Sequence, residues 1–297
     1  MPAPPGTTAG RPPGSGETPS SQSPLDVTKN GRRDELRVTF RVLQIPVWQD
    51  NYAYLLEADD GTTGLVDSPE AAPILASLSR SGRTLTHIFN THHHPDHIGS
   101  NAALIERFPD LEVWGGSYDA EHGRIPGQTR AVVDGETFRW GGVSCTVRTI
   151  PGHTHGHIAY LWDNGCAFVG DTLFYGGCGR LFEGSAEQLD HALYEVLGPL
   201  PDDTQVFCAH EYTEANLRFA AHVDPTNATL QAAIREVRAL RSAGRSTVPS
   251  TIKREHDVNP FLRCDTHAIR LAVGSPPGAP RHEVLGALRR MKDEFRG

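Results

Sequence analysis

Residues 90–97 read NTHHHPDH and place four histidines and one aspartate within eight residues. Borderline divalent cations such as zinc accept imidazole and carboxylate ligands together. The apolar, β-rich run TLTHIFNT leads into this cluster, and Pro95 interrupts it. The cluster therefore differs from an affinity tag, which is an uninterrupted run of histidines at a terminus. It predicts a metal site at the end of a strand.

The spacing within the cluster divides it into two pairs of ligands. His92 and His94 are two residues apart, and an extended strand directs alternate side chains to the same side. His93 is then expected to point away. Pro95 turns the chain, so that Asp96 and His97 follow in a new direction. We expect His92 and His94 to face one metal ion, and Asp96 and His97 to face a second.

Three further candidate ligands follow apolar strand-like runs downstream. They are His153 in PGHTHGH, Asp171 in FVGDTLF and His210 in VFCAHEY. Taken alone, each is more simply explained as a hydrogen-bonded histidine or a turn aspartate. Strand ends collect at one edge of a sheet, however, and the chance of an HxHxDH cluster followed in order by all three is small. We therefore expect them to complete one metal centre.

The rest of the chain predicts a mixed α/β domain followed by helices. Residues 1–36 are rich in Pro, Gly, Ser and Thr and are expected to be a disordered tail, with a transit peptide as the alternative. Residues 37–212 alternate short strands with helices: YAYLLEADDGTTGLVD predicts a hairpin, IGSNAALIERF a helix, and SAEQLDHALYEVLGPLP a helix capped by Ser185 and Gln188. Residues 213–297 show helical patterns without a strong strand signal.

The composition restricts the possible partners. The 297 residues carry a formal net charge of −8, which argues against nucleic acid as the main partner. No apolar run reaches the roughly 20 residues that span a bilayer, and no secretory signal is evident. The five cysteines form no CxxC pair, which favours a reducing compartment. We expect a monomeric cytoplasmic protein, with organellar targeting by the tail as the alternative.

THHHPDH, PGHTHGH, GDT and CAHEY together resemble the metallo-β-lactamase superfamily, whose fold is an αββα sandwich. Within it, QDNYAYLL, LFYGGCGRLFEG, TVPSTIKREHDVNPF and RRMKDEF are similar to glyoxalase II, the hydroxyacylglutathione hydrolases, and the similarity covers residues 38–297. It implies a thioesterase that hydrolyses S-D-lactoylglutathione to D-lactate and glutathione, the second step of methylglyoxal detoxification. It also implies a C-terminal helical domain that binds glutathione.

The resemblance also implies a role for each ligand. The first metal ion would be held by His92, His94 and His153, and the second by Asp96, His97 and His210. Asp171 would bridge the two ions together with a water molecule, so that Asp96 and Asp171 are the catalytic residues. Asp67 would orient a ligand, although a turn aspartate before Ser-Pro is an equal alternative. Zinc is the expected metal, and iron and manganese suit the same ligands.

On the substrate side, the resemblance assigns Arg289 and Lys292 to the glycine carboxylate of glutathione. Arg180 stands where many members have lysine, and Tyr212 matches a tyrosine that hydrogen-bonds glutathione. Phe182 replaces a common tyrosine and lacks its hydroxyl. Without the resemblance, Arg289 and Lys292 would be read as a solvated helix face. The five cysteines and His155 are assigned no role, His157 is expected to be structural, and His87 to pack or lie on the surface.

Three alternatives remain open. A glutathione persulfide dioxygenase shares HxHxDH but uses a single iron and lacks the extended helical C-terminus. A lactonase or β-lactamase also lacks that C-terminus. A non-catalytic metal-binding protein would be expected to close its site with four ligands, commonly cysteines. No GxSxG motif of a serine hydrolase occurs in the sequence. A pair of metal ions can instead activate water as the nucleophile at neutral pH.

Overall fold

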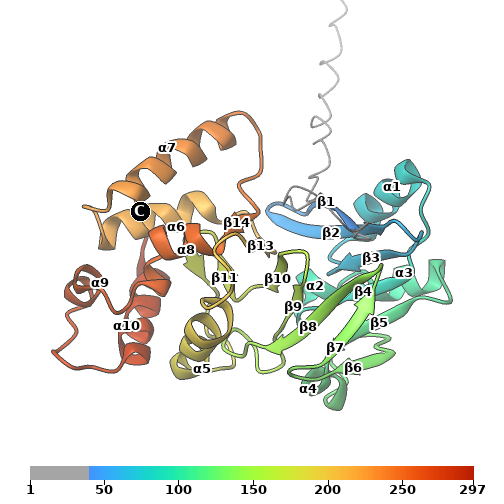
Figure 1. Cartoon of the computed structure of the whole chain (residues 1–297), viewed down its shortest axis with the longest axis horizontal. Coiled ribbons are helices and arrows are strands. Elements are labelled where there is room, and N and C mark those ends of the chain that lie inside the picture. Colours follow the sequence, from blue (N-terminus) through green and yellow to red (C-terminus); the bar gives the residue numbers. More distant parts are fainter. Residues whose placement is uncertain (1–39) are drawn as a thin grey trace, which may run out of the picture.

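The computed structural model describes residues 40–297, and the predicted disordered tail, residues 1–36, lies outside them. Within residues 40–297, two six-stranded sheets pack face to face with helices outside them (Figure 1). The predicted αββα sandwich is confirmed.

The first sheet runs in sequence order through β1 Phe40–Val47, β2 Asn51–Ala58, β3 Thr63–Val66, β4 His87–Phe89, β5 Glu112–Gly116 and β6 Arg130–Val132. The second has the order β14-β13-β10-β9-β8-β7, from β14 Ser250–Thr251, β13 Gln205–Cys208, β10 Cys166–Gly170, β9 Ile158–Trp162, β8 Val143–Thr149 and β7 Thr137–Trp140.

The first sheet combines the predicted hairpin with parallel strands. β2 and β3 pair antiparallel, with Tyr54 opposite Val66, across the turn at Asp60 and Gly61. From β3 to β6 the strands run parallel. Because carboxyl ends of parallel strands meet at one edge, the chain leaves β4 at the same edge as β3 and β5.

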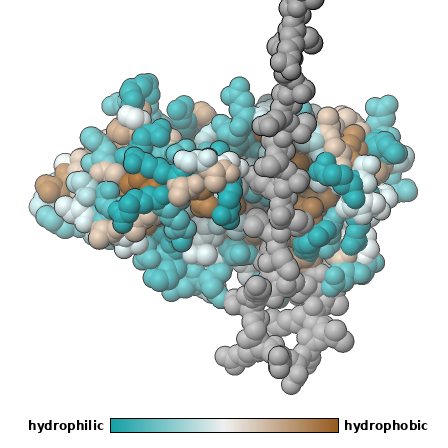
Figure 2. All heavy atoms as spheres, turned by 90° about the horizontal axis from the view of Figure 1, so that it is seen from above, coloured by the Kyte–Doolittle hydropathy of each residue, from teal (hydrophilic) through white to brown (hydrophobic). Residues whose placement is uncertain are grey.

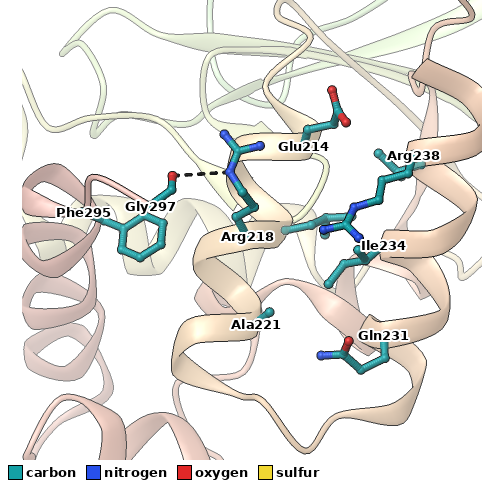
Figure 3. Close-up of a pocket in the computed structure, with 10 residues that line it drawn as sticks. Glu214, Arg218, Ala221, Gln231, Ile234, Arg238, Phe295 and Gly297 are labelled. Carbon is teal, nitrogen blue, oxygen red and sulfur yellow. Dashed lines mark hydrogen bonds between the residues drawn. The ribbon is translucent and has the colours of Figure 1, made fainter. Parts of the chain in front are cut away.

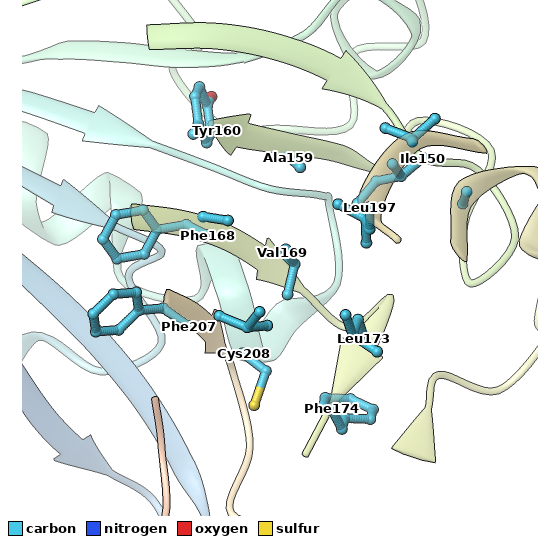
Figure 4. Packing of buried hydrophobic residues seen from close by; sticks show 14 of the residues in the cluster. Ile150, Ala159, Tyr160, Phe168, Val169, Leu173, Phe174, Leu197, Phe207 and Cys208 are labelled. Carbon is cyan, nitrogen blue, oxygen red and sulfur yellow. The ribbon is translucent and has the colours of Figure 1, made fainter. Parts of the chain in front are cut away.

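The core lies between the sheets and is rich in aromatic side chains. Phe89 of β4 lies edge-on to Tyr160 of β9, with ring centroids 5.5 Å apart. Phe168 and Phe207, on adjacent strands of the second sheet, stack at 4.9 Å (Figure 4). A separate apolar layer, which includes Ile88, packs the first sheet against its helices. The two layers explain why β2 and β3 are buried on both faces.

The helices before β13 are α1 Ala71–Ser81, α2 Pro95–Ile98, α3 Asn101–Arg107, α4 Ser117–Glu121, α5 Ala186–His191 and the π-helical turn η1 Ala192–Leu197. The predicted capping box between Ser185 and Gln188 is confirmed. The helix expected from IGSNAALIERF is confirmed over Asn101–Arg107, but its expected start is wrong, because Ile98 ends α2 and α3 begins at Asn101. Gly99 lies in this break, where a Cβ would come within 2.6 Å of the Pro95 carbonyl oxygen.

After β13 the chain is mainly helical, with α6 Thr213–Val223, α7 Ala228–Ser242, α8 Ile252–Val258, the 3₁₀ turn η2 Pro260–Leu262, α9 His267–Ala272 and α10 Arg281–Glu294. This region also adds one strand that its helical patterns did not predict, because β14 pairs with β13 at the edge of the second sheet. Two residues are too few for a detectable alternating pattern. The helices also share the main core, to which Phe261 and Leu288 contribute.

A short hairpin connects the sandwich to the helices. It consists of β11 Leu173–Phe174 and β12 Gly177–Cys178. Asn259, at the end of α8, donates hydrogen bonds to the carbonyl oxygens of Phe174 and Gly177. The hairpin is therefore held from the helical side.

The face of the molecule seen in Figure 2 is largely hydrophilic, with scattered apolar areas. Within the described chain, the exposed large hydrophobic residues are Trp48, Val133, Phe182, Tyr212 and Leu271. No helix of residues 40–297 has the length and apolar character needed to cross a membrane.

Candidate metal centre

The predicted ligands meet at one end of the sandwich, on loops that follow strands of both sheets. His92 and His94 follow β4, His153 follows β8, Asp171 follows β10 and His210 follows β13. Asp96 and His97 lie on the single turn of α2. Among the described residues, these side chains fall into two groups whose ligand atoms lie within 4.8 Å of one another: His92, His94 and His153 in the first, and Asp96, His97, Asp171 and His210 in the second.

The first group brings three imidazole nitrogens together. His94 Nδ1 lies 3.1 Å from His92 Nε2 and 3.0 Å from His153 Nε2. Burial is the main cause that lowers the pKa of all three rings, and neighbouring histidines add to it. Neutral rings present lone pairs, and three lone pairs converging at this distance suit a cation. Metal binding by this group stays a prediction.

The second group combines carboxylates with histidines. Asp171 Oδ1 lies 3.4 Å from His97 Nε2, and Asp171 Oδ2 lies 3.4 Å from both His210 Nε2 and His153 Nε2. Asp171 therefore faces both groups, as a bridging ligand requires. The buried atoms His97 Nε2 and Asp171 Oδ1 have no hydrogen-bond partner among the described residues. Buried polar atoms are normally paired, so these two atoms fit a site built for a cation.

The second group is also strongly charged. Burial opposes a charge on His97 and His210, but Asp171 and the other carboxylates around them raise their pKa values to about 10 and about 11. Burial likewise opposes the charge of Asp96, yet hydrogen bonding to His210 lowers its pKa to about 2. The carboxylates hold positive charge at these nitrogens, which is the place a cation would take.

Four of the histidines are oriented through the ring nitrogen that faces away from the centre. His97 Nδ1 donates to Asp67 Oδ2 at 2.7 Å, and His153 Nδ1 donates to the carbonyl oxygen of Arg180 at 2.8 Å. Thr91 Oγ1 lies 3.1 Å from His92 Nδ1, and His210 Nδ1 lies 3.0 Å from Asp50 Oδ1. Such partners fix the tautomer so that Nε2 is free to bind a metal.

Two residues around the centre were missed by the sequence reasoning. Asp50 contacts His210, and Asn51 Nδ2 donates to the backbone oxygen of Asp96 at 3.3 Å. Both lie in QDNYAYLL, which served only as a family signature. Asp67 adopts φ of 57° and accepts from Thr91 as well as from His97. It lies where a residue that orients a ligand would lie.

Two histidines that were given no ligand role, His157 and His93, lie next to the ligands. His157 is fully buried, stacks on His92 and accepts a hydrogen bond from the backbone N–H of Asp171. His93 points away from His92 and His94, toward Arg124 and Glu183. The expected reason, strand alternation, is wrong because β4 ends at Phe89 and residues 92–94 form an irregular segment. The opposite directions of His93 and of its two neighbours therefore arise in an irregular segment and not in a strand.

A cavity of about 580 Å³ opens above the two groups. All five residues predicted to bind substrate line it: Arg180, Phe182, Tyr212, Arg289 and Lys292. The Phe182 ring lies 5.1 Å from that of His153, and the Tyr212 ring stacks on His210 at 4.6 Å. Cys178 also lines the cavity, but burial raises the pKa of its thiol to about 11, which disfavours a nucleophilic thiolate.

The basic residues that line the cavity differ in their exposure and in the hydrogen bonds that they already make within the protein. Arg180 is well exposed, whereas Arg289 is buried and donates to the carbonyl oxygen of Cys178 and to Asp293. Lys292 Nζ donates to the carbonyl oxygen of Ala215 at 3.0 Å, and burial lowers its pKa to about 8. Arg296, which was not predicted, also lines the cavity.

A second cavity, of about 390 Å³, lies between α6 and α7 (Figure 3). Arg218 and Arg238 line it, together with apolar residues such as Ile234. It contains none of the grouped histidines, and only Phe295 lines both cavities. The chemistry of the ligand groups is therefore confined to the first cavity.

Comparison with known proteins identifies the families to which the two parts of the chain are similar. Residues 47–210 match the family model described as metallo-β-lactamase superfamily, and residues 211–295 match hydroxyacylglutathione hydrolase C-terminus. A hydroxyacylglutathione hydrolase from Synechococcus sp. (strain JA-2-3B'a(2-13)) is 50% identical over 86% of this chain and 100% of its own length. The enzyme of that name from Methylococcus capsulatus is 49% identical over 86% and 99%.

Solved structures share the fold. The crystal structure of ETHE1 from Myxococcus xanthus has a TM-score of 0.58 and 27% identity, and the match covers 85% of this chain and 97% of that one. The structure of TTHA1623 in a di-iron-bound form has a TM-score of 0.53 and 25% identity, with coverage of 74% and 99%.

Proposed function

The chain belongs to the hydroxyacylglutathione hydrolase family, and from this we propose that it hydrolyses S-D-lactoylglutathione to D-lactate and glutathione. One observation supports this above the others. The two ligand groups form the floor of a cavity whose opposite wall is the basic helix α10. A floor that fits cations suits hydrolysis, and a basic wall suits a substrate with two carboxylates.

We assign one divalent ion to His92, His94 and His153 and a second to Asp96, His97 and His210, with Asp171 shared between them. Zinc is the ion we propose, since it accepts imidazole and carboxylate together. When bound, such a pair of ions lowers the pKa of water and polarises a carbonyl oxygen. Asp67 and Asp50 hold His97 and His210 in the tautomer that this requires.

The residues of the floor orient the attacking water. Asp171 lines the cavity with Oδ1 toward His97 and Oδ2 toward both His153 and His210, and Asp96 Oδ2 lies 3.4 Å from His210 Nε2. Their carboxylates accept hydrogen bonds from the water and direct its lone pair at the thioester carbon. The water oxygen forms the new C–O bond as one of its protons passes to a carboxylate of the floor, and the C–S bond then breaks. The sulfur leaves as a thiolate, which needs no strong general acid.

The wall binds the glutathione part of the substrate. Lys292 and Arg289 are assigned to the glycine carboxylate, Arg180 to the second carboxylate, and Tyr212 to a hydrogen bond through its hydroxyl. Residues 211–297 contain 14 Lys and Arg against 10 Asp and Glu, whereas the whole chain contains 28 against 36. A net charge of +4 in this region, against −12 in residues 1–210, attracts an anionic substrate to the wall.

The proposal is tested by metal analysis combined with a hydrolysis assay on S-D-lactoylglutathione. We expect two equivalents of zinc and release of free thiol. Metal-loaded protein without turnover would overturn the proposal, and protein that consumes oxygen with glutathione persulfide would overturn it in favour of the dioxygenase. We further propose that the protein is a cytoplasmic monomer, which size-exclusion chromatography and cell fractionation test.

A further inference from the structure

His93 belongs to a polar network on the side of the metal loop that faces away from the cavity. Arg124 donates through Nη2 to His93 Nε2 and through Nη1 to Glu183 Oε2, the latter at 3.2 Å. His93 Nδ1 lies 3.6 Å from Asp119 Oδ1. Because Arg124 donates to Nε2, a neutral His93 carries its proton on Nδ1, facing Asp119. The ring is therefore hydrogen-bonded to Arg124 on its Nε2 side, and its Nδ1 side faces the Asp119 carboxylate without a hydrogen bond.

Glu183 extends this network to a second loop. Its Oε2 accepts a hydrogen bond from the backbone N–H of His155 at 2.8 Å, and its own N–H donates to the carbonyl oxygen of His153 at 3.4 Å. Arg124 also donates through Nη2 to Glu183 Oε1. The Arg124–Glu183 pair thus joins the loop that carries His92 and His94 to the loop that carries His153.

Asp119, on α4, contacts the loop of residues 153–157 that carries His153. Its carboxylate is fully buried and lies against Gly156, where a Cβ would come within 2.4 Å of Asp119 Oδ1. Arg124 Nε lies 3.7 Å from the same oxygen. The loop of residues 153–157 therefore rests on α4, and Arg124, which follows α4, reaches both loops.

We propose that Arg124 and Glu183 are positioning residues that hold the two loops together, so that His92, His94 and His153 stay at metal-binding distance. His94 Nδ1 lies 3.1 Å from His92 Nε2 on its own loop and 3.0 Å from His153 Nε2 on the other loop. Binding sites tolerate displacements of only about 0.5 Å, so a small slip between the loops weakens the first group. In the second group, His97 and His210 are oriented by Asp67 and Asp50. Among the described residues, these two aspartates form no hydrogen bond or ion pair with Arg124 or Glu183. The inference rests on the proposed function only in that the centre binds metal.

The test measures Zn²⁺ binding to the full-length protein by titration against a competing chelator. The variants are Arg124→Met, which keeps the length of the side chain, and Glu183→Gln, which keeps its shape and an acceptor for His155. Loss of an outer partner typically costs 10–100-fold in metal affinity. We expect about a tenfold or larger loss for one of two Zn²⁺ equivalents, no change for the other, and partial recovery in Arg124→Lys.

The matched control is Arg281→Met. Arg281 makes a comparable two-pronged pair with Asp190, with side-chain exposures of 27% and 13% against 21% and 23% for Arg124 and Glu183. This control should lose thermal stability but bind both equivalents like the wild type. Wild-type binding of both equivalents by Arg124→Met and Glu183→Gln would overturn the proposal. Equal weakening of both equivalents, or a wild type that binds fewer than two, would also overturn it.

Zn²⁺ titration uses no substrate, so it separates this inference from the proposed function. A wild type that binds two Zn²⁺ but fails to hydrolyse S-D-lactoylglutathione would refute the proposed function and leave the titration result intact. A wild type that hydrolyses the thioester, with variants that bind Zn²⁺ normally, would refute only the positioning role.

Discussion

On the floor of the cavity, the histidines make their internal hydrogen bonds through nitrogens that face away from it. His97 is bonded to Asp67, and His210 to Asp50. On the wall, Lys292 and Arg289 instead give donors to the backbone oxygens of Ala215 and Cys178. The floor therefore presents histidine nitrogens that are available to a cation. The basic side chains of the wall must break hydrogen bonds to the backbone before they can form new ones to a substrate. Substitutions on the floor should therefore have larger effects.

The largest effect is expected for Asp171→Ala, because the Asp171 carboxylate lies 3.4 Å from a ligand nitrogen of each group. Loss of an outer partner costs 10–100-fold in metal affinity, so loss of a shared ligand should cost more than about 100-fold. Activity should fall in parallel. Metal analysis after dialysis and the thioester assay measure both.

Asp224→Ala is the control for this change. Asp224 is equally buried but pairs with Arg263 on the helical side. This variant should lose stability and keep both metal equivalents. An active Asp171→Ala variant that retains its metal would contradict the shared-ligand assignment.

The β11–β12 hairpin connects the sandwich, which carries the floor, to the helices, which carry the wall. Glu255 contacts this hairpin, and we expect it to make the stability of the fold depend on pH. Burial raises the pKa of this carboxyl to about 7, and it accepts from the Gly176 N–H of the β11–β12 hairpin and from Asn259. A raised carboxyl pKa favours the folded state at low pH, so stability falls as pH rises from about 4.5 through 7. Between pH 5 and pH 8, Glu255→Gln should remove a loss of roughly 2–3 kcal/mol.

Urea unfolding of wild type and variant at both pH values measures this difference. Glu214→Gln, at an exposed carboxylate of α6, should follow the wild type at each pH. If the stabilities of wild type and Glu255→Gln change in parallel with pH, Glu255 does not carry this dependence.

The same contrast explains what the sequence could predict. The ligand candidates lie on the floor, where HxHxDH places four of them in one short segment and strand ends supply the others. The contacts of Asp67 with His97 and of Asp50 with His210 cross 30 and 160 residues, so no local pattern reveals them. The wall depends on how α10 packs, which periodicity does not fix. Arg289 was expected to meet substrate, and its burial beside Cys178 was not foreseeable.

A smaller effect is expected for Asp67→Asn on the floor. The amide cannot offer two anionic acceptors to Thr91 and His97, so the tautomer of His97 is less well fixed. We expect a loss of Zn²⁺ affinity near the lower end of the 10–100-fold range, larger for the equivalent that His97 binds than for the one that His92 binds. Zn²⁺ titration measures it, and Asp60→Asn at an exposed turn is the control. Unchanged affinity in Asp67→Asn would make Asp67 an ordinary turn aspartate.

The smallest effect is expected on the wall, for Lys292→Met. A charged hydrogen bond to a substrate carboxylate that replaces an internal bond to Ala215 is worth about 1 kcal/mol, which is roughly fivefold in KM. kcat should change less than about twofold, because this contact is equal in ground and transition states. Steady-state kinetics separates the two constants. Arg290→Met, at an exposed neighbour on α10, is the control.

The pH dependence of KM makes this last test specific to the charge of Lys292. Burial lowers its pKa to about 8, so the ammonium loses its proton as pH rises from 7 to 9. Wild-type KM should rise over this range, and KM of Lys292→Met should not. A variant in which kcat falls while KM is unchanged would contradict the division, because the wall would then contribute to the chemical step as the floor does.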